Sequence, residues 1–298
     1  MANDIIYYIL YAMFKALALL PFCVLYVLAD FVDFLLYHVV RYRRKVVEDN
    51  LAKCFPDKTP EERKRIERNF YRHFADCFVE TIKLLHISDR EVERRITFEN
   101  VELIDSLTKA GKSIVVYFSH CGNWEWAPSV TLHTTTEGVE YCQVYRPLRN
   151  KAFDRIMLKV RSRFGSRSFA KTTVFRDLLR LKKDGIVSVT GFMSDQKPSH
   201  GDPTYVTMFL NRPTAFITGT ETLATRMGMA AVYWDMEKIS RGHYRIVTRL
   251  LDDGSHQAPR GELTQNYAIL LETTIRRNPS IWLWTHKRWK NKVTLEQK

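Results

Sequence analysis

The chain has 298 residues, 45% of them hydrophobic, with 46 basic and 33 acidic side chains. This length and hydrophobic content allow a substantial buried core and exclude an intrinsically disordered protein. The net charge of +13 predicts an anionic partner, such as nucleic acid, phospholipid head groups, a phosphorylated substrate or an acidic carrier protein. The five cysteines are widely spaced and form no Cys-x-x-Cys motif, so we expect free thiols in a reducing compartment and no zinc site.

An apolar segment begins the chain. From Ile5 to Ala29 the only charged residue is Lys15, and about 20 apolar residues suffice for a helix to span a bilayer. Four basic residues then occur within residues 41–45, and the positive-inside rule places this flank on the cytoplasmic side. We therefore predict that residues 1–45 form a membrane anchor and that residues 46–298 form a single cytoplasmic α/β domain.

A second arrangement of the apolar segment is also consistent with the sequence. Lys15, Asp30 and Asp33 interrupt it, and charged residues are costly inside a bilayer. The segment can instead form two helices, broken near Pro21, that are buried or lie in the plane of the membrane. Residues 41–298 carry 45 basic and 30 acidic side chains, so the positive charge lies outside this segment.

Residues 46–100 have the pattern of amphipathic helices. Thr59, Pro60 and Glu62 form a capping box with proline at the first helical position, which predicts a helix start. The helix that follows has one apolar face, and we expect the face to pack in the core. Its members are Ile66, Phe70, Phe74, Cys77, Phe78, Ile82 and Leu85. Shorter helices are predicted over residues 88–95 and 101–110, the second ended by Gly111.

Three apolar segments, residues 114–118, 139–145 and 186–192, predict buried strands with helices between them. Each strand is followed by a polar segment. This alternation predicts an α/β fold with a mostly parallel central sheet flanked by helices, and with the polar segments at one edge. Ligands in such sheets bind at the carboxyl ends of the strands. We expect the side chains there to bind substrate: Asn123, Arg146, Arg149, Asp195 and Gln196.

The last third of the chain predicts a turn at residues 209–213, a helix over 214–227 and an antiparallel hairpin of residues 230–234 and 244–250. A helix over 263–277 follows. The tail, residues 281–290, interleaves aromatic and basic side chains. This pattern is compatible with core packing with a solvated basic face, with an interfacial membrane belt or with stacking on nucleic acid.

The polar segment after the first strand carries His120 and, five residues later, Glu125. A carboxylate on one ring nitrogen of a histidine fixes its tautomer, and the other nitrogen can then take a proton from a hydroxyl. We expect Glu125 to orient His120 in this way. The chain has no Gly-x-Ser-x-Gly elbow, and Cys121 is adjacent to His120, where side chains diverge. The sequence therefore favours direct activation of a substrate hydroxyl without a covalent enzyme intermediate.

The His-x-x-x-x-Glu motif at residues 120–125 resembles the signature of glycerolipid and lipid A acyltransferases. The rest of the chain is similar to the late lipid A acyltransferases of Gram-negative bacteria, the lauroyl and myristoyl transferases of the lysophospholipid acyltransferase superfamily. The similarity lies in an ordered set of segments: the N-terminal apolar anchor, Asn50 with Cys54-Phe55-Pro56, Gly122–Glu125, Tyr145-Arg146-Pro147, Asp195-Gln196, Phe209–Pro213 with the following helix, and Trp284–Lys290.

This resemblance implies transfer of a fatty acyl chain from acyl carrier protein to a hydroxyl of a lipid A precursor at the cytoplasmic side of the bacterial inner membrane. His120 would be the general base and Glu125 its orienting residue. Arg146 would bind phosphate or steady the site, and Asp195 and Gln196 would line it. The acyl carrier protein thioester would be the co-substrate, with no metal, no other cofactor and no nucleic-acid partner. Departures from the family pattern are Cys121, Arg149 and Lys197.

Two other functions remain open on the sequence. The first is an acyltransferase of the same fold that acts on a lysophospholipid or another glycolipid hydroxyl. The second is a protein of another class, either a membrane-tethered nucleic-acid-binding protein or a non-catalytic membrane scaffold. The chain has no recognisable nucleic-acid-binding motif, and a scaffold would not need polar segments after three successive strands.

Overall fold

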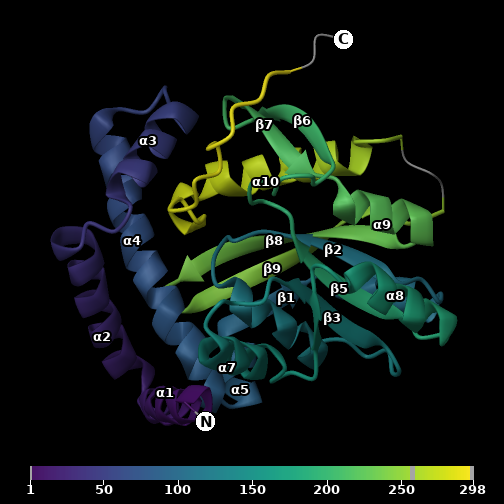
Figure 1. Ribbon diagram of the computed structural model, residues 1–298, viewed down its shortest axis with the longest axis horizontal. Coiled ribbons are helices and arrows are strands. Elements are labelled where there is room, and N and C mark those ends of the chain that lie inside the picture. Colours follow the sequence, from purple (N-terminus) through teal and green to yellow (C-terminus); the bar gives the residue numbers. More distant parts are fainter. Residues whose placement is uncertain (1, 256–258, 296–298) are drawn as a thin grey trace.

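A seven-stranded sheet lies at the centre of the computed structural model, which describes residues 2–255 and 259–295 (Figure 1). Its strands are β1 (Ile96–Glu99), β2 (Ile114–Phe118), β3 (Glu140–Tyr145), β4 (Arg167–Ala170), β5 (Ser188–Met193), β8 (Ala230–Ser240) and β9 (His243–Asp252). Their order is β1-β9-β8-β2-β5-β3-β4, and every neighbouring pair is parallel except β8 and β9. The predicted α/β fold with a mostly parallel sheet is confirmed, as is the antiparallel hairpin.

The sequence of β2 explains its central position. All five of its residues are apolar or aromatic and buried, as expected for a parallel strand covered on both faces. It pairs with β8 on one side and β5 on the other, with Phe118 opposite Met193 at the carboxyl end. Because β2 and β5 are parallel, the polar segments that follow them leave the sheet side by side.

Helices surround the sheet, with α9 and α10 on one side and α5 and α7 on the other in Figure 1. The α-helices are α1 (Ala2–Leu19), α2 (Phe22–Phe34), α3 (Arg44–Cys54), α4 (Pro60–Lys83), α5 (Asp89–Arg95), α6 (Glu102–Lys109), α7 (Lys151–Arg161), α8 (Val174–Lys183), α9 (Gly219–Met227) and α10 (Glu262–Arg277). A π-helical turn covers Leu35–Val39, and 3-10 helices cover Leu84–His86, Trp124–Leu132 and Pro279–Ile281.

Helix α4 begins at the predicted capping box. The Thr59 hydroxyl accepts from the backbone of Glu62, and the Glu62 carboxylate accepts from the backbone of Thr59. Most of the predicted apolar face packs in the core or against it, as expected. Phe78 is the exception, because its side chain points away from the core and is 49% exposed.

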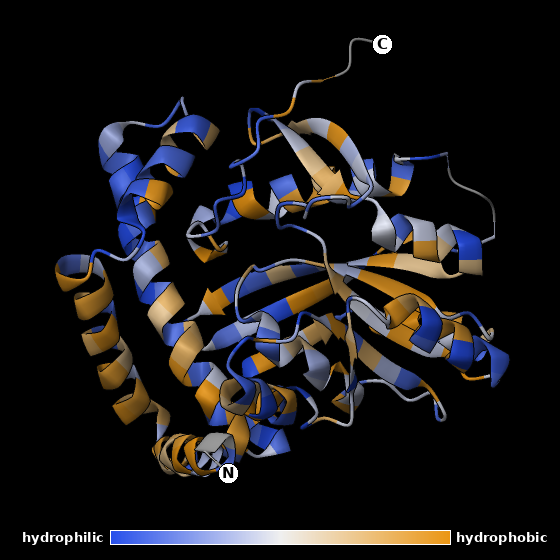
Figure 2. Ribbon diagram, in the orientation of Figure 1, coloured by the Kyte–Doolittle hydropathy of each residue, from blue (hydrophilic) through white to orange (hydrophobic). Residues whose placement is uncertain are grey.

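The N-terminal segment forms two helices, α1 and α2, with the break at Leu20-Pro21. Helix α1 packs against α4 and α7, and α2 packs along α4. Both helices are strongly apolar, as Figure 2 shows. Residues Phe22–Val39 are long and apolar enough to cross a membrane, judged by length and composition alone. The division of the chain at residue 45 stays a prediction.

One predicted helix is wrong in its first part. Residues expected to start the helix over 214–227 belong to a separate hairpin of β6 (Thr204–Phe209) and β7 (Arg212–Ile217), and the helix begins only at Gly219. Burial alternates along β7, with Thr214 and Phe216 inside, which is the period of a strand. The short strands β1 and β4 were also not predicted.

The start of α10 depends on a carboxylate from another helix. Glu221 on α9 is 4% exposed and accepts hydrogen bonds from the backbone of Gly261 and from the backbone and hydroxyl of Thr264. These N–H groups belong to the first turn of α10, where no intrahelical acceptor exists.

We expect Glu221→Gln to lower the free energy of unfolding by about 2 kcal/mol, because one buried donor loses its acceptor and the negative charge at the helix start is lost. Denaturant unfolding followed by circular dichroism measures this change. Glu262→Gln, in the same helical turn but exposed, is the matched control and should lie within about 0.5 kcal/mol of wild type. Equal effects of the two substitutions would contradict the capping role of Glu221.

Candidate active site

His120 lies directly after β2, and Asp195 lies directly after β5. The ring Nδ1 of His120 is 2.7 Å from Oδ1 of Asp195, and the backbone N–H of His120 donates to Oδ2 at 3.0 Å. The parallel pairing of β2 with β5 produces this contact, since it brings the two strand ends together. His120 and Asp195 therefore pair at the edge of the sheet where polar side chains were expected to meet.

Asp195 is 2% exposed and holds three donors. Besides the two from His120, the indole Nε1 of Trp282 donates to Oδ2 at 2.9 Å. Burial raises the pKa of Asp195, but the charge of His120 and these hydrogen bonds outweigh burial and lower the pKa to about 2. Asp195 is thus ionised at neutral pH, and as a pure acceptor it requires that Nδ1 of His120 carries the proton.

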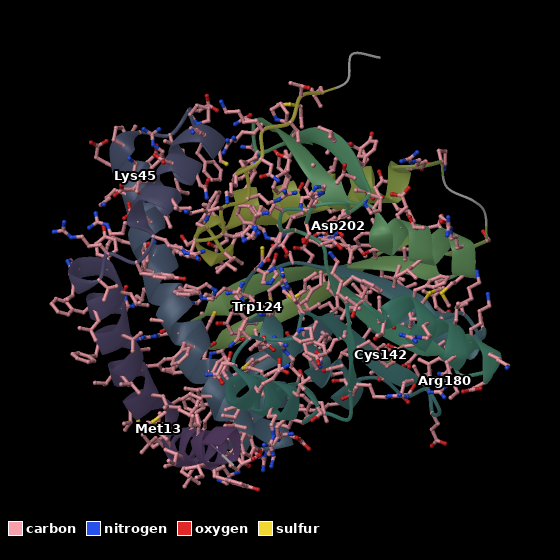
Figure 3. All side chains as sticks on the ribbon, in the orientation of Figure 1. Met13, Lys45, Trp124, Cys142, Arg180 and Asp202 are labelled. Atoms are coloured by element: carbon pink, nitrogen blue, oxygen red, sulfur yellow. The ribbon has the colours of Figure 1, made fainter. Side chains whose placement is uncertain are left out.

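The second ring nitrogen of His120 faces Gln196. The side-chain Nε2 of Gln196 lies 3.1 Å from Nε2 of His120, and the amide donates because the ring proton is on Nδ1. The His120 side chain is 16% exposed, and the ring of Trp124 packs edge-on against it at 5.0 Å. Trp124 lies near the middle of the view in Figure 3. The structure therefore offers Nε2 of His120 as a basic nitrogen at the end of the sheet.

The sequence predicted a contact between Glu125 and His120, but the structure does not show one. Its carboxylate forms a two-pronged ion pair with Arg161 of α7, with distances of 2.6 and 2.9 Å. The reason lies in the intervening loop, because Gly122 has a φ of 59° and the chain turns there before the 3-10 helix that begins at Trp124. The carboxylate on the ring is Asp195, and a catalytic role of Glu125 stays a prediction.

The loop that carries His120 packs against the C-terminal tail. The backbone N–H of Gly122 donates to Ile281, the N–H of Leu283 donates to His120, and Cys121 forms a β-bridge with Trp282. A Cβ at Gly122 would come within 2.6 Å of the Met236 side chain, so both the space and the backbone conformation require glycine.

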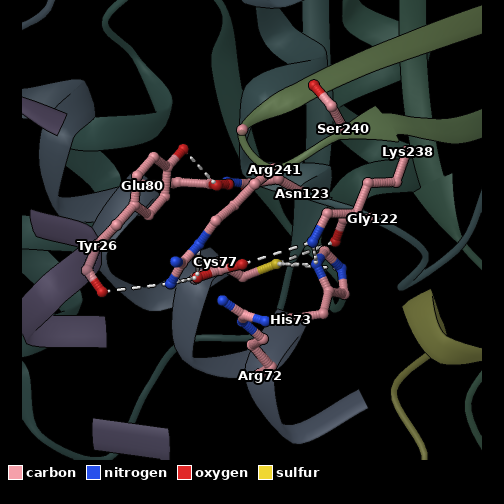
Figure 4. A network of polar contacts seen from close by, with 12 residues as sticks. Tyr26, Arg72, His73, Cys77, Glu80, Gly122, Asn123, Lys238, Ser240 and Arg241 are labelled. Atoms are coloured by element: carbon pink, nitrogen blue, oxygen red, sulfur yellow. Dashed lines mark hydrogen bonds and ion pairs between the residues drawn. The ribbon is translucent and has the colours of Figure 1, made fainter. Parts of the chain in front are cut away.

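A buried carboxylate supports the loop from the other side. Glu80 of α4 is fully buried and accepts from the Asn123 amide at 2.8 Å, from the Tyr244 hydroxyl at 2.8 Å and from the Tyr26 hydroxyl at 3.1 Å. Burial raises the pKa of Glu80, while the bonds from Asn123 and Tyr244 lower it. Figure 4 shows this network. Asn123 is 1% exposed and holds the loop in place, and its contact with substrate stays a prediction.

Arg146 and Arg149 follow β3, the strand beyond β5. Both are exposed, and neither forms a hydrogen bond or ion pair with another described residue. Tyr145, at the end of β3, lines a groove of about 710 Å³ whose basic side chains are Lys159 and Arg167. The two arginines are thus available to an anionic ligand, as their predicted role requires, although the structure does not bring them into contact with His120.

The tail contributes side chains that the sequence did not assign to the site. Trp282 holds Asp195, and His286 accepts from the backbone N–H of Lys197 at 3.2 Å through Nε2. Burial lowers the pKa of His286 to about 4, so its ring is neutral. Asn50 fixes the tail by donating to the carbonyls of Trp284 and His286. Of the three interpretations of the tail, core packing is confirmed, because Trp282 and Trp284 are buried. In the sequence, the only indication that the tail has a role at the site was the similarity of Trp284–Lys290 to the family.

A model of the bacterial lipid A biosynthesis acyltransferase family matches residues 1–291. The chain belongs to this family. It is 22% identical over 278 residues to the lipid A biosynthesis palmitoleoyltransferase of Escherichia coli and 23% identical over 276 residues to the lauroyltransferase of that organism, and each match covers 92% of this chain and 87% of the relative. A match to the lipid A biosynthesis acyltransferase of Haemophilus influenzae, 25% identical over 149 residues, covers 50% of this chain and only 46% of that relative. The predicted resemblance and the prediction of an acyltransferase are confirmed.

We expect Asp195→Asn to lower the kcat of this acyltransferase on the order of 10³-fold with a smaller change in KM, because the amide can neither fix the tautomer of His120 nor stabilise its protonated ring. Steady-state kinetics with an acyl thioester donor measures both constants.

Glu125→Gln is the matched control, since it makes the same chemical change in the other carboxylate of the region. We expect a loss on the order of tenfold, reproduced by Arg161→Gln because the two side chains act as a pair. A larger loss of kcat in Glu125→Gln than in Asp195→Asn, with both variants folded, would indicate that Glu125 is the carboxylate that orients His120.

Proposed function

We propose that this acyltransferase transfers a fatty acyl chain from acyl carrier protein to a hydroxyl of a lipid A precursor, with the domain on the cytoplasmic side of the bacterial inner membrane. The observation that carries the proposal is the His120–Asp195 pair at the ends of β2 and β5, which leaves Nε2 of His120 as the unprotonated, basic nitrogen. Membership of the family supplies the reaction class, and the names of the E. coli relatives support the acceptor.

The pair supports general-base catalysis. Nε2 of His120 removes the proton of the acceptor hydroxyl as its oxygen attacks the thioester carbonyl, and the imidazolium that forms is stabilised by ionised Asp195. The tetrahedral intermediate then expels the thiolate of the carrier, which takes the proton from His120. The ester and the free thiol are the products, and His120 is neutral again. In this scheme Gln196 gives up its contact with Nε2 when the hydroxyl binds.

The state of Cys121 supports direct transfer without an acyl-enzyme. The thiol is fully buried next to the base, and burial raises its pKa far above neutrality. A thiolate is the nucleophilic form of cysteine, so a buried protonated thiol is a poor nucleophile. The substrate hydroxyl is then the group that His120 activates.

The charge of the chain suits the proposed partners. A net charge of +13 attracts both an acidic carrier and a phosphorylated glycolipid. Along the chain, exposed Arg146 and Arg149 follow Tyr145, which lines the groove, and they are our candidates for phosphate binding. Membrane association rests on the apolar helices α1 and α2, and it would hold the enzyme at the surface where its acceptor resides.

We expect a strain lacking this protein to make lipid A with one acyl chain fewer, and expect wild type but not His120→Ala to restore it, since alanine cannot accept the hydroxyl proton. Mass spectrometry of lipid A measures the acyl count. His86→Ala, an exposed histidine on the 3-10 helix after α4, is the control and should complement fully.

An unchanged lipid A acyl count in the deletion strain, in the absence of a redundant paralogue, would favour an acceptor such as a lysophospholipid or another glycolipid. Wild-type turnover by folded His120→Ala protein would refute the mechanism itself.

A further inference from the structure

The helices α1 and α2 expose large apolar side chains on the side that faces away from the domain. Large hydrophobic side chains on this face are exposed, including Val27 at 70% and Phe31 at 57%. The other members are Ile5, Ile6, Tyr8, Ile9, Met13, Leu19, Val24 and Phe34. Isolated apolar side chains on a surface are normal, whereas a contiguous apolar surface marks a binding site. Figure 2 shows both helices as mostly hydrophobic.

The opposite face of each helix is part of the folded domain. Leu25 and Ala29 of α2 are each 1% exposed and pack against Ala75 and Val79 of α4. In α1, the buried residue Ala18 belongs to a cluster with Ile82 and Ile156 of the domain. The two helices therefore have an inner face that the domain covers and an outer face that nothing in the described chain covers.

Polar contacts fix α2 along α4. The carboxylate of Asp33 pairs with Arg68 at 2.9 Å, the hydroxyl of Tyr26 donates to Glu80 at 3.1 Å, and the carbonyl of Leu20 accepts from Lys83 at 2.7 Å. Residue numbers rise along α2 as they fall along α4, so the helices are antiparallel over the whole length of α2.

The remaining charges of the segment also have partners in the domain. Asp30 pairs with Arg241 at 2.6 Å, and Lys15 donates to the carbonyl of Leu85 at 2.7 Å. The three charges that interrupt the apolar segment, Lys15, Asp30 and Asp33, are thus all satisfied by contacts with the rest of the protein.

These contacts conflict with a membrane-spanning α2. A span would carry the paired region of α4 into hydrocarbon with half-buried Arg68 and exposed Arg72, or would separate Asp30 and Asp33 from their partners inside the bilayer. Either outcome costs several kcal/mol for each charge.

We infer that α1 and α2 lie in the plane of the membrane, with the outer apolar face inserted among the lipids and the inner face fixed to the domain. This inference deepens the membrane association in the proposed function. A lipid surface is the occupant that the charges favour, because Arg41, Arg43 and Lys45 are exposed just after the helices and match anionic head groups.

The arrangement also fixes the site relative to the membrane. Tyr26 of α2 and Asn123 of the His120 loop both donate to Glu80 (Figure 4). One buried carboxylate thus joins the membrane-facing helix to the loop that carries the base, so the end of the sheet keeps a constant orientation to the lipid surface from which an acceptor would come.

Vesicle binding by the purified full-length protein tests the inference. We expect Val27→Asp/Phe31→Asp to lower the partition coefficient on phosphatidylethanolamine–phosphatidylglycerol vesicles at least about tenfold, because two inserted apolar side chains become charged. Leu250→Asp/Ile269→Asp is the matched control, since these residues are similarly exposed, at 49% and 54%, but lie on β9 and α10. It should bind as wild type does. Unchanged vesicle binding by the first variant would overturn the inference. So would a wild-type protein that is a dimer in solution and a first variant that is a monomer, because the outer face would then be an interface between two copies of the chain.

Membrane topology provides the second test. With an epitope tag at each terminus, we expect added protease to remove both tags in inverted membrane vesicles and neither tag in intact spheroplasts. Removal of the N-terminal tag in spheroplasts would show a spanning helix and overturn the in-plane arrangement. Neither test measures acyl transfer, so a failure of the proposed function leaves their results unaffected, and a failed membrane test leaves the activity assay valid.

Discussion

The buried carboxylate of Asp195 is the contact on which the candidate site depends. One side chain accepts from the ring and the backbone of His120 and from the indole of Trp282, so it joins the ends of β2 and β5 to the C-terminal tail. An ionised carboxylate at 2% exposure is stable only because each of these donors is present. The same bonds that keep the charge buried also determine which nitrogen of His120 is free, so the stability of this region and its chemistry have one cause.

Two buried carboxylates with opposite pKa shifts hold the His120 loop from its two sides. Asp195 accepts from a partner that can become cationic, and its pKa is lowered to about 2, whereas burial raises the pKa of Glu80 although Asn123 and Tyr244 donate to it. Only the first of them contacts the base. Asp195 therefore lies where a protonated imidazole would form, whereas Glu80 fixes Asn123 and the loop from the other side.

The sequence was sufficient to predict the sheet and its polar edge, but not the contact between His120 and Asp195. Strand–helix alternation placed His120 and Asp195 at one edge, because parallel strands present their carboxyl ends together. The choice between Asp195 and Glu125 depends on the register of β2 against β5 and on the turn at Gly122, and neither is encoded in local spacing. The hairpin of β6 and β7 was missed for a similar reason. Residues 214–217 are compatible with the period of a helix or of a strand, and only the burial of Thr214 and Phe216 in the folded protein distinguishes the two. Trp282 and His286 reach the site only through the fold of the tail.

The contacts of the N-terminal helices could also not be predicted from the sequence. Along the sequence, Lys15, Asp30 and Asp33 only weaken the pattern of a spanning helix, and their cost in a membrane depends on what they contact. The structure gives each of them a partner in the domain, which converts an interrupted apolar segment into an amphipathic pair of helices. The charges that would oppose a span hold the helices beside α4, and the apolar side chains left outside are the ones that we propose insert into a lipid surface. The proposed membrane binding and the position of His120 would in this way both follow from one set of contacts along α4.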